Sequence, residues 1–253
     1  MDFTHLYETF RALEDPNFWQ DAYMKFYRAW FEADRWKQYF EGLATTVQVT
    51  VMALIIGVIL GVVVAMIRTA HDQQRLGRRN PFLGVVNFLC KVYVTIIRGT
   101  PMMVQLLIMG LVIFASNRNK TIIGALSLGI NSGAYVAEII RGGLMSLDPG
   151  QNEAGRSLGL GYFDTMRFIV IPQAFKAVLP ALGNEFITLL KDTSLISVIG
   201  GKEIVYFAQA IITRTYETMY PYLITAVMYL IMVLIFTWLQ SKLERRLRQS
   251  DRR

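Results

Sequence analysis

Residues 42–67 read GLATTVQVTVMALIIGVILGVVVAMI, and none of these side chains carries a charge. A helix needs about 20 predominantly apolar residues to cross the hydrocarbon core of a bilayer. The run exceeds that length, so the sequence predicts a membrane-spanning helix here. Residues 1–41 are acidic and do not open on the short basic region of a cleaved signal peptide, and we therefore expect this helix to stay in the membrane.

The composition of the whole chain agrees with this prediction. Of its 253 residues 53% are hydrophobic and 18% are charged, and the mean hydropathy is +0.36. Such values are typical of a membrane protein. Cys90 is the only cysteine, and His5 and His71 are the only histidines. These few residues exclude a disulfide framework and a Cys/His zinc site, and we expect no metal centre and no catalytic residue.

The net charge of +7 is distributed unevenly. Acids outnumber bases before residue 42, whereas basic clusters follow the first and the last apolar run: Arg68, Arg75, Arg78 and Arg79, then Lys242, Arg245, Arg246, Arg248, Arg252 and Arg253. Lysine and arginine clusters beside a span mark the cytoplasmic side of a membrane. The asymmetry therefore predicts an outside N-terminus and a cytoplasmic C-terminus, and it argues against nucleic-acid binding.

Four further spans are expected, which makes the chain an all-α, polytopic membrane protein with five transmembrane helices. Arg98-Gly99-Thr100-Pro101 breaks the second apolar stretch, because proline removes a donor and disfavours helix at the preceding residue. We expect an elbow or interfacial helix up to about residue 97 and the second span over residues 101–114. The other spans are expected over residues 121–147, 173–201 and 222–240. The transmembrane domain then covers residues 42–241, and residues 242–253 form a basic cytoplasmic tail.

Two features leave alternatives open. Residues 1–41 form an extracytoplasmic extension with aromatic side chains at near-helical spacing, which suits an amphipathic helix lying on the membrane surface or one packed on this protein or a partner. In the first span Ala53, Gly57, Gly61 and Ala65 recur every fourth residue. Such a small-residue ridge packs closely on another helix, either within the chain or in a second subunit.

Residues 149–172 interrupt the apolar chain with a polar segment on the predicted cytoplasmic side. Gly159 and Gly161 supply a stop for a first short helix, Asp164 can cap a second one, and Pro172 is expected to bend the path. A short helix that lies outside the membrane between two spans is not needed to cross the bilayer. We expect it to contact something soluble.

This segment resembles the EAA loop of ABC-importer permeases. The run Glu153-Ala154-Gly155, three residues, Gly159, nine residues and Ile169-Val170-Ile171-Pro172 has the spacing of that motif, with Gly155 in place of alanine and Ile171 in place of leucine. Three further stretches are similar to the histidine/glutamine/arginine branch of polar amino-acid permeases: residues 98–105, residues 137–143 and residues 182–195 with its Lys191-Asp192-Thr193-Ser194-Leu195 run.

The resemblance implies most of what we expect of function. It implies the five-span type I importer fold in the bacterial inner membrane, and a permease subunit that forms the path for polar or charged amino acids. It implies a dimer of permease subunits, identical or related, two cytoplasmic ATPases and an extracytoplasmic amino-acid-binding protein. ATP and Mg²⁺ would bind the ATPases, and this chain would bind no cofactor. Glu153, Ala154, Gly155 and Gly159 would couple the chain to the ATPase. The long aromatic N-terminal extension and the short loop after the second span depart from the family pattern.

Ionisable groups inside a span are functional hypotheses, because they are costly unless paired or hydrated. Around the fourth span the candidates for contact with a zwitterionic cargo are Asn184, Glu185, Lys191, Asp192, Thr193 and Ser194. Alternatively, Lys191 and Asp192 pair with each other, or with Arg98 or Glu138, to fix helix geometry. An ion-coupled secondary transporter of small solutes is the second functional hypothesis, although it offers no reason for the EAA spacing.

Overall fold

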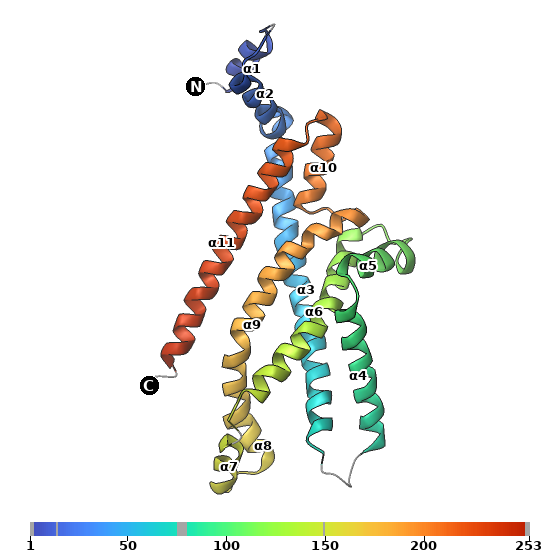
Figure 1. Cartoon of the computed structure of the whole chain (residues 1–253), viewed down its shortest axis with the longest axis vertical. Helices are drawn as coiled ribbons and strands as arrows, with labels where there is room; N and C mark the ends of the chain where they lie inside the picture. Colours follow the sequence, from blue (N-terminus) through green and yellow to red (C-terminus); the bar gives the residue numbers. More distant parts are fainter. Residues whose placement is uncertain (1–2, 14, 75–79, 149, 251–253) are drawn as a thin grey trace.

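The computed structural model describes residues 3–13, 15–74, 80–148 and 150–250, and within these ranges it contains helices and no strand. The chain runs along one long axis (Figure 1). Its elements are α1 (Phe3–Arg11), α2 (Phe18–Trp30), η1 (Glu32–Asp34), α3 (Arg35–Asp72), α4 (Pro81–Gly99), α5 (Met102–Leu107), η2 (Ile108–Ile113), α6 (Lys120–Met145), α7 (Gly150–Ser157), α8 (Tyr162–Thr165), η3 (Met166–Val170), α9 (Ile171–Asp192), η4 (Thr193–Ile199), α10 (Ile204–Thr215) and α11 (Met219–Ser250).

Five helical stretches in the described ranges are long and apolar enough to cross a membrane: Glu32–Asp72, Pro81–Gly99, Lys120–Met145, Phe163–Ile199 and Met219–Leu247. The predicted number of spans is confirmed, but the predicted second span is wrong. The crossing helix is α4, which ends at the Pro101 break, whereas the apolar helix after the break covers only Met102–Ile113. At 1.5 Å per residue these 12 residues are too short for a bilayer core about 30 Å thick.

The small-residue ridge of α3 packs on α6 of the same chain. A Cβ added to Gly57 would lie 2.8 Å from the Ser132 hydroxyl, and one added to Gly61 would lie 2.5 Å from the Val136 side chain. Gly129 of α6 approaches Ile56 of α3 in the same way, so glycines on both helices permit the contact. The close approach of two backbones is therefore an intramolecular one, as expected of small residues between helices in lipid.

We predict that Gly61→Leu lowers the thermal unfolding temperature of the purified protein in detergent by several degrees. The larger side chain would have to displace Val136 and the backbone nitrogen of Ala137, and overpacking costs about 1–3 kcal/mol. Gly84→Leu in α4 is the matched control, because a Cβ there meets nothing within 4 Å. Equal unfolding temperatures of the leucine variant and the wild type would contradict this packing.

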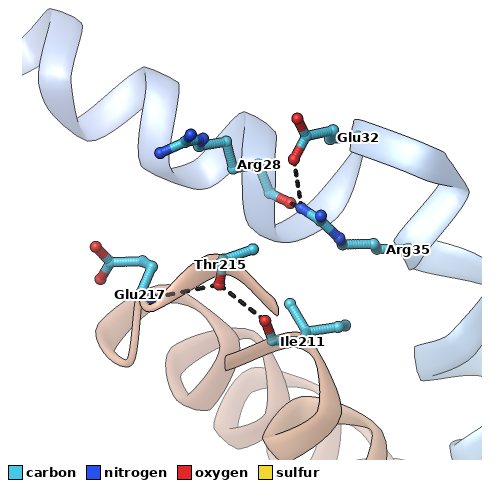
Figure 2. Close-up of polar contacts among 6 residues, drawn as sticks. All are labelled: Arg28, Glu32, Arg35, Ile211, Thr215 and Glu217. Carbon is cyan, nitrogen blue, oxygen red and sulfur yellow. Dashed lines mark hydrogen bonds and ion pairs between the residues drawn. The ribbon is translucent and has the colours of Figure 1, made fainter. Parts of the chain in front are cut away.

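The N-terminal extension forms two helices that pack on each other. Tyr7 of α1 stacks on Tyr27 of α2 with ring centroids 4.4 Å apart, and Phe26 meets Tyr220 at the start of α11. The turn into α3 is fixed by Arg35, whose side chain is nearly buried and donates to the Arg28 carbonyl and, at 2.6 Å, to the Glu32 carboxylate (Figure 2). α1 and α2 thus stand beyond the end of α3 that lies near α10 (Figure 1). Contact of this extension with a membrane surface stays a prediction.

A buried carboxylate joins three elements near the start of α10. Glu203 accepts hydrogen bonds from the backbone N–H groups of Val205 and Tyr206, both at 2.8 Å, and from the Tyr229 hydroxyl of α11 at 2.9 Å. The Tyr229 hydroxyl lies 3.4 Å from that of Thr193 in η4. Burial raises the pKa of Glu203 to about 7, although these hydrogen bonds act in the opposite direction.

This raised pKa predicts a pH dependence of stability. The folded protein holds the Glu203 proton more tightly than the unfolded chain does, so the contribution of Glu203 to stability falls as the pH rises from about 4.5 to about 7. We expect the unfolding temperature of the wild type, relative to that of Glu203→Gln, to increase as the pH is lowered from about 8 to about 5. A difference that does not change with pH, or changes in the opposite direction, would refute this prediction.

Candidate functional site

Residues 150–172 of the polar segment, which we call the coupling segment, protrude at the end of the molecule opposite α1 and α2 (Figure 1). Its first helix, α7, ends in a Schellman motif: Gly159 has φ +77°, its N–H donates to Arg156 at 3.0 Å, and the Leu160 N–H donates to Gly155 at 3.1 Å. The predicted stop at Gly159 is thereby confirmed. Only a residue that tolerates the left-handed region suits this position.

The predicted coupling residues differ in exposure. Glu153, Ala154 and Gly159 are exposed, whereas Gly155 is buried against Thr165 of α8. A Cβ added to Gly155 would lie 2.7 Å from the Thr165 methyl group. The glycine that replaces the family's alanine therefore permits the close approach of α7 and α8. The large apolar side chains of Leu158 and Phe163 are 78% and 72% exposed on the same segment.

The coupling segment continues into α9 without a break. The expected separate helix capped by Asp164 and the expected bend at Pro172 are wrong, because α8, η3 and α9 follow one another directly and Asp164 lies in the first turn of α8. The π-helix η3, with its wide i→i+5 turn, directly precedes Pro172, which is the second residue of α9 and does not interrupt the helical run. Movement of the coupling segment can therefore pass to α9 along continuous helix.

α9 and the following η4 carry the predicted cargo residues. Glu185 is half-buried and accepts a hydrogen bond from the buried Ser132 hydroxyl of α6 at 2.7 Å. Asn184 is exposed and accepts from Gln240 of α11 at 2.9 Å. About two turns further on, Lys191 is exposed and Asp192 is half-buried.

The expected alternative, in which Lys191 and Asp192 pair to fix helix geometry, is not found among the described residues. Glu138 pairs instead with Arg68 and, at 3.8 Å, with Arg98. Thr193 is buried and donates to the Leu190 carbonyl at 2.7 Å, and Ser194 donates to the Lys191 carbonyl at 2.8 Å. The hydroxyls of Thr193 and Ser194 are therefore engaged by their own helix turn.

A polar stripe runs along the outer face of α9. Asn184, Thr188 and Lys191 are all exposed, and their i, i+4 and i+7 spacing places them on one face. The stripe lies in a stretch apolar enough to span a membrane. Polar and charged side chains at such depth face a bundle interior or a water-filled cavity, so this face is not suited to lipid.

The break between α4 and α5 is held by a side chain that sequence reasoning missed. Pro101 has no N–H to offer the Ile97 carbonyl, and the Gln105 amide donates to that carbonyl at 2.8 Å. The oxygen of the same amide accepts from Asn131 of α6 at 3.0 Å. The residue pattern contains a signal for this, because a proline four residues after a helical carbonyl always leaves that carbonyl without its backbone donor.

Comparison with known proteins identifies the family to which this chain belongs. Residues 79–249 match the model of the family described as "Binding-protein-dependent transport system inner membrane component". The chain belongs to this family. It is a permease subunit of the ABC-importer type and a multi-pass cell-membrane protein.

Relatives of this permease subunit are curated amino-acid transport components. It is 37% identical over 216 residues to the arginine transport system permease protein ArtQ of Bacillus subtilis, covering 83% of this chain and 93% of ArtQ. It is 36% identical over 168 residues to the glutamine transport system permease protein GlnP of Escherichia coli, covering 65% of this chain and 77% of GlnP. These similarities favour the importer hypothesis over an ion-coupled transporter.

Solved structures of ABC transporters share the fold of this permease subunit. A crystal structure of an amino acid ABC transporter with histidines has a TM-score of 0.74 at 42% identity, covering 83% of this chain and 94% of that one. An inward-facing MetNI methionine ABC transporter has a TM-score of 0.70 at 15% identity, which shows the common fold alone. Among the described residues of the permease no cluster of His, Cys, Asp or Glu could hold a metal ion.

Proposed function

We propose that this permease subunit forms the path for a polar or charged amino acid in an ATP-driven importer. The observation that carries the proposal is the continuous helix from the protruding coupling segment into α9, where Asn184, Glu185, Lys191 and Asp192 lie within a span. The relatives that transport arginine and glutamine support an amino-acid cargo. ATP and Mg²⁺ bind a separate ATPase, and the chain itself supplies no catalytic residue.

In this proposal the coupling segment faces the cytoplasm and seats in an ATPase subunit. Leu158 and Phe163 offer exposed apolar anchors, and Glu153 in the first turn of α7 offers a charge for an ATPase arginine. Closure of two ATPases on ATP moves the coupling segments, and α9 follows as part of the same helical run. The spans then change from inward-facing to outward-facing.

The polar stripe of α9 supports a proposed second permease subunit, identical or related, on the other side of the path. Two such stripes would enclose a hydrated passage, which removes the cost of exposing Lys191 to lipid. Glu185 and Asp192 would accept from the ammonium of the cargo, and Lys191 and Asn184 would donate to its carboxylate. Ser194 would line the path mainly through backbone groups, since its hydroxyl is engaged, whereas the fully buried Thr193 would not contact the cargo. An extracytoplasmic binding protein delivers the cargo at the opposite end.

The test uses the permease purified together with its ATPase, its second permease subunit and its binding protein. ATP hydrolysis by proteoliposomes is measured with each of the twenty amino acids, and we expect one amino acid or a few similar ones to stimulate it. Stimulation should require the binding protein. Uptake driven by an ion gradient without ATP, or the absence of any amino-acid response, would refute the proposed function.

A further inference from the structure

An open cavity of about 340 Å³ lies between α3, α4 and α6, apart from the polar stripe of α9. Its lining is unusually basic for a membrane-spanning region. It consists of Arg68, Lys91, Val94, Thr95, Arg98 and Glu138. Three of these side chains are cationic and one is anionic.

Glu138 compensates only part of this positive charge. One of its carboxylate oxygens accepts a hydrogen bond from Arg68, and the other lies 3.8 Å from Arg98. In the described part of the chain no carboxylate lies within ion-pair distance of Lys91. The nearby Arg141 is paired separately with Asp72 at 3.0 Å. The cavity therefore keeps an excess of two positive charges.

The arginines are arranged to receive a further partner. The Arg68 side chain is 12% exposed, and its Nε is buried without a hydrogen-bond acceptor among the described residues. Arg98 lies over the Tyr135 ring, with its guanidinium carbon 5.4 Å from the ring centroid, which holds the group at the cavity. An unpaired buried donor beside an excess of positive charge is costly, and an anion in the cavity would offset that charge.

The cavity is lined by guanidinium, ammonium and hydroxyl groups, all of which can donate hydrogen bonds to an oxyanion. Arginine presents a planar fork to carboxylate or phosphate, lysine adds a point charge, and the Thr95 hydroxyl adds a neutral donor. The volume accommodates a small carboxylate or a phosphate with its first substituents. Charged groups inside spans mark ligand pathways, and basic pockets between spans also bind lipid headgroups.

We propose that the Arg68, Lys91, Thr95 and Arg98 cavity binds an oxyanion, either the carboxylate of the cargo at a second position on its path, separate from Lys191 and Asn184, or the phosphate of an anionic lipid. The cargo source rests on the proposed function, whereas the lipid source does not. Glu138 competes with this anion, because its carboxylate already interacts with Arg68 and Arg98. The two sources are distinguished by two experiments on the full transporter complex.

The first experiment measures lipid retention. The complex is exchanged into phosphatidylcholine nanodiscs with or without phosphatidylglycerol, and bound lipid is counted by native mass spectrometry. If lipid phosphate is the anion, Lys91→Gln should retain at least about threefold less phosphatidylglycerol than the wild type, with phosphatidylcholine unchanged. Arg118→Gln, an exposed change outside the cavity, serves as the matched control.

The second experiment measures cargo binding in nanodiscs of phosphatidylcholine alone. Radiolabelled arginine and glutamine are compared with their decarboxylated amines. If the cargo carboxylate is the anion, the wild type should bind an amino acid at least about tenfold more tightly than its amine. Lys91→Gln should reduce this preference at least about threefold, whereas Arg118→Gln should leave it unchanged. Should no amino acid stimulate ATP hydrolysis, the proposed function fails and the lipid experiment still decides the site.

Glu138→Gln separates an anion site from a purely structural ion pair. Removal of the competing carboxylate should increase whichever anion the cavity holds, by about threefold or more, whereas Lys91→Gln and Arg98→Gln should decrease it. If these residues had only a structural role, all three variants would be less stable, and the amount of bound anion would not rise in one variant and fall in the other two. The proposal is overturned if Lys91→Gln changes neither lipid retention nor the carboxylate preference, or if Glu138→Gln lowers both.

Discussion

Gly159→Val is expected to reduce cargo-stimulated ATP hydrolysis by the assembled transporter at least about tenfold. Gly159 has φ +77°, a conformation that costs an L-residue roughly 1–2 kcal/mol and a β-branched one more. Relief of that strain would open the two hydrogen bonds of the Schellman motif, from Gly159 to Arg156 and from Leu160 to Gly155. α7 would then lose its fixed direction relative to α8. ATP hydrolysis and co-purification of the ATPase subunits are the measurements.

Gly159→Asn provides the matched control. Asparagine visits the left-handed region far more readily than valine, so this variant should keep most of the stimulation although it also adds a side chain. Both variants should keep the unfolding temperature of the membrane part near that of the wild type, because Gly159 is exposed and a Cβ there meets nothing within 4 Å. Wild-type stimulation of the valine variant would contradict a coupling role for this turn.

The sequence predicts the fold correctly where a local residue pattern is compatible with only one structure. An uncharged run such as residues 42–67 is too long for a soluble helix, and a glycine that ends a polar helical stretch adopts the left-handed conformation. The Ala53 to Ala65 ridge also predicted a close helix contact. The ridge could not identify its partner, because a small-residue face fits any helix of similar shape, and only the structure places it on α6.

The incorrect predictions concern helix breaks. Residues 81–114 are apolar on both sides of Pro101, so hydropathy could not say which side crosses the membrane. The length of α4 decides it. Pro172 is expected to bend the path, but it follows a π turn and the helical run continues through it. A proline indicates that a hydrogen bond is missing, and the geometry around it decides whether the helix stops there.

Partners across helices were beyond the reach of the sequence. Ser132 of α6 and Glu185 of α9 are 53 residues apart in the chain, and Asn131 and Gln105 are 26 apart. These pairs form because of how each helix is rotated about its axis, which depends on the packing of the whole bundle. Residue types identified Glu185 as a candidate for cargo contact. They gave no indication that a buried hydroxyl already occupies one of its oxygens.

This hydrogen bond makes the role of Glu185 testable, and we predict that Glu185→Gln lowers amino-acid transport at least about tenfold with assembly intact. A hydrogen bond to a charged group contributes about 1.5–3 kcal/mol, which corresponds to roughly 10- to 150-fold in affinity. Glutamine keeps the size of the side chain and an oxygen that can accept from Ser132. It loses the negative charge that a cargo ammonium would meet.

Ser132→Ala distinguishes cargo contact from a tie between helices. If Glu185 serves only to join α9 to α6, removal of the hydroxyl breaks the same 2.7 Å bond and should impair transport more than Glu185→Gln, which can keep that bond. If the charge of Glu185 meets the cargo, Ser132→Ala leaves the carboxylate in place and should cost only about two- to threefold. Uptake of the stimulating amino acid into proteoliposomes is measured for both variants, and the ratio of the two effects decides between the roles. Lower uptake by Ser132→Ala than by Glu185→Gln would assign Glu185 to helix packing.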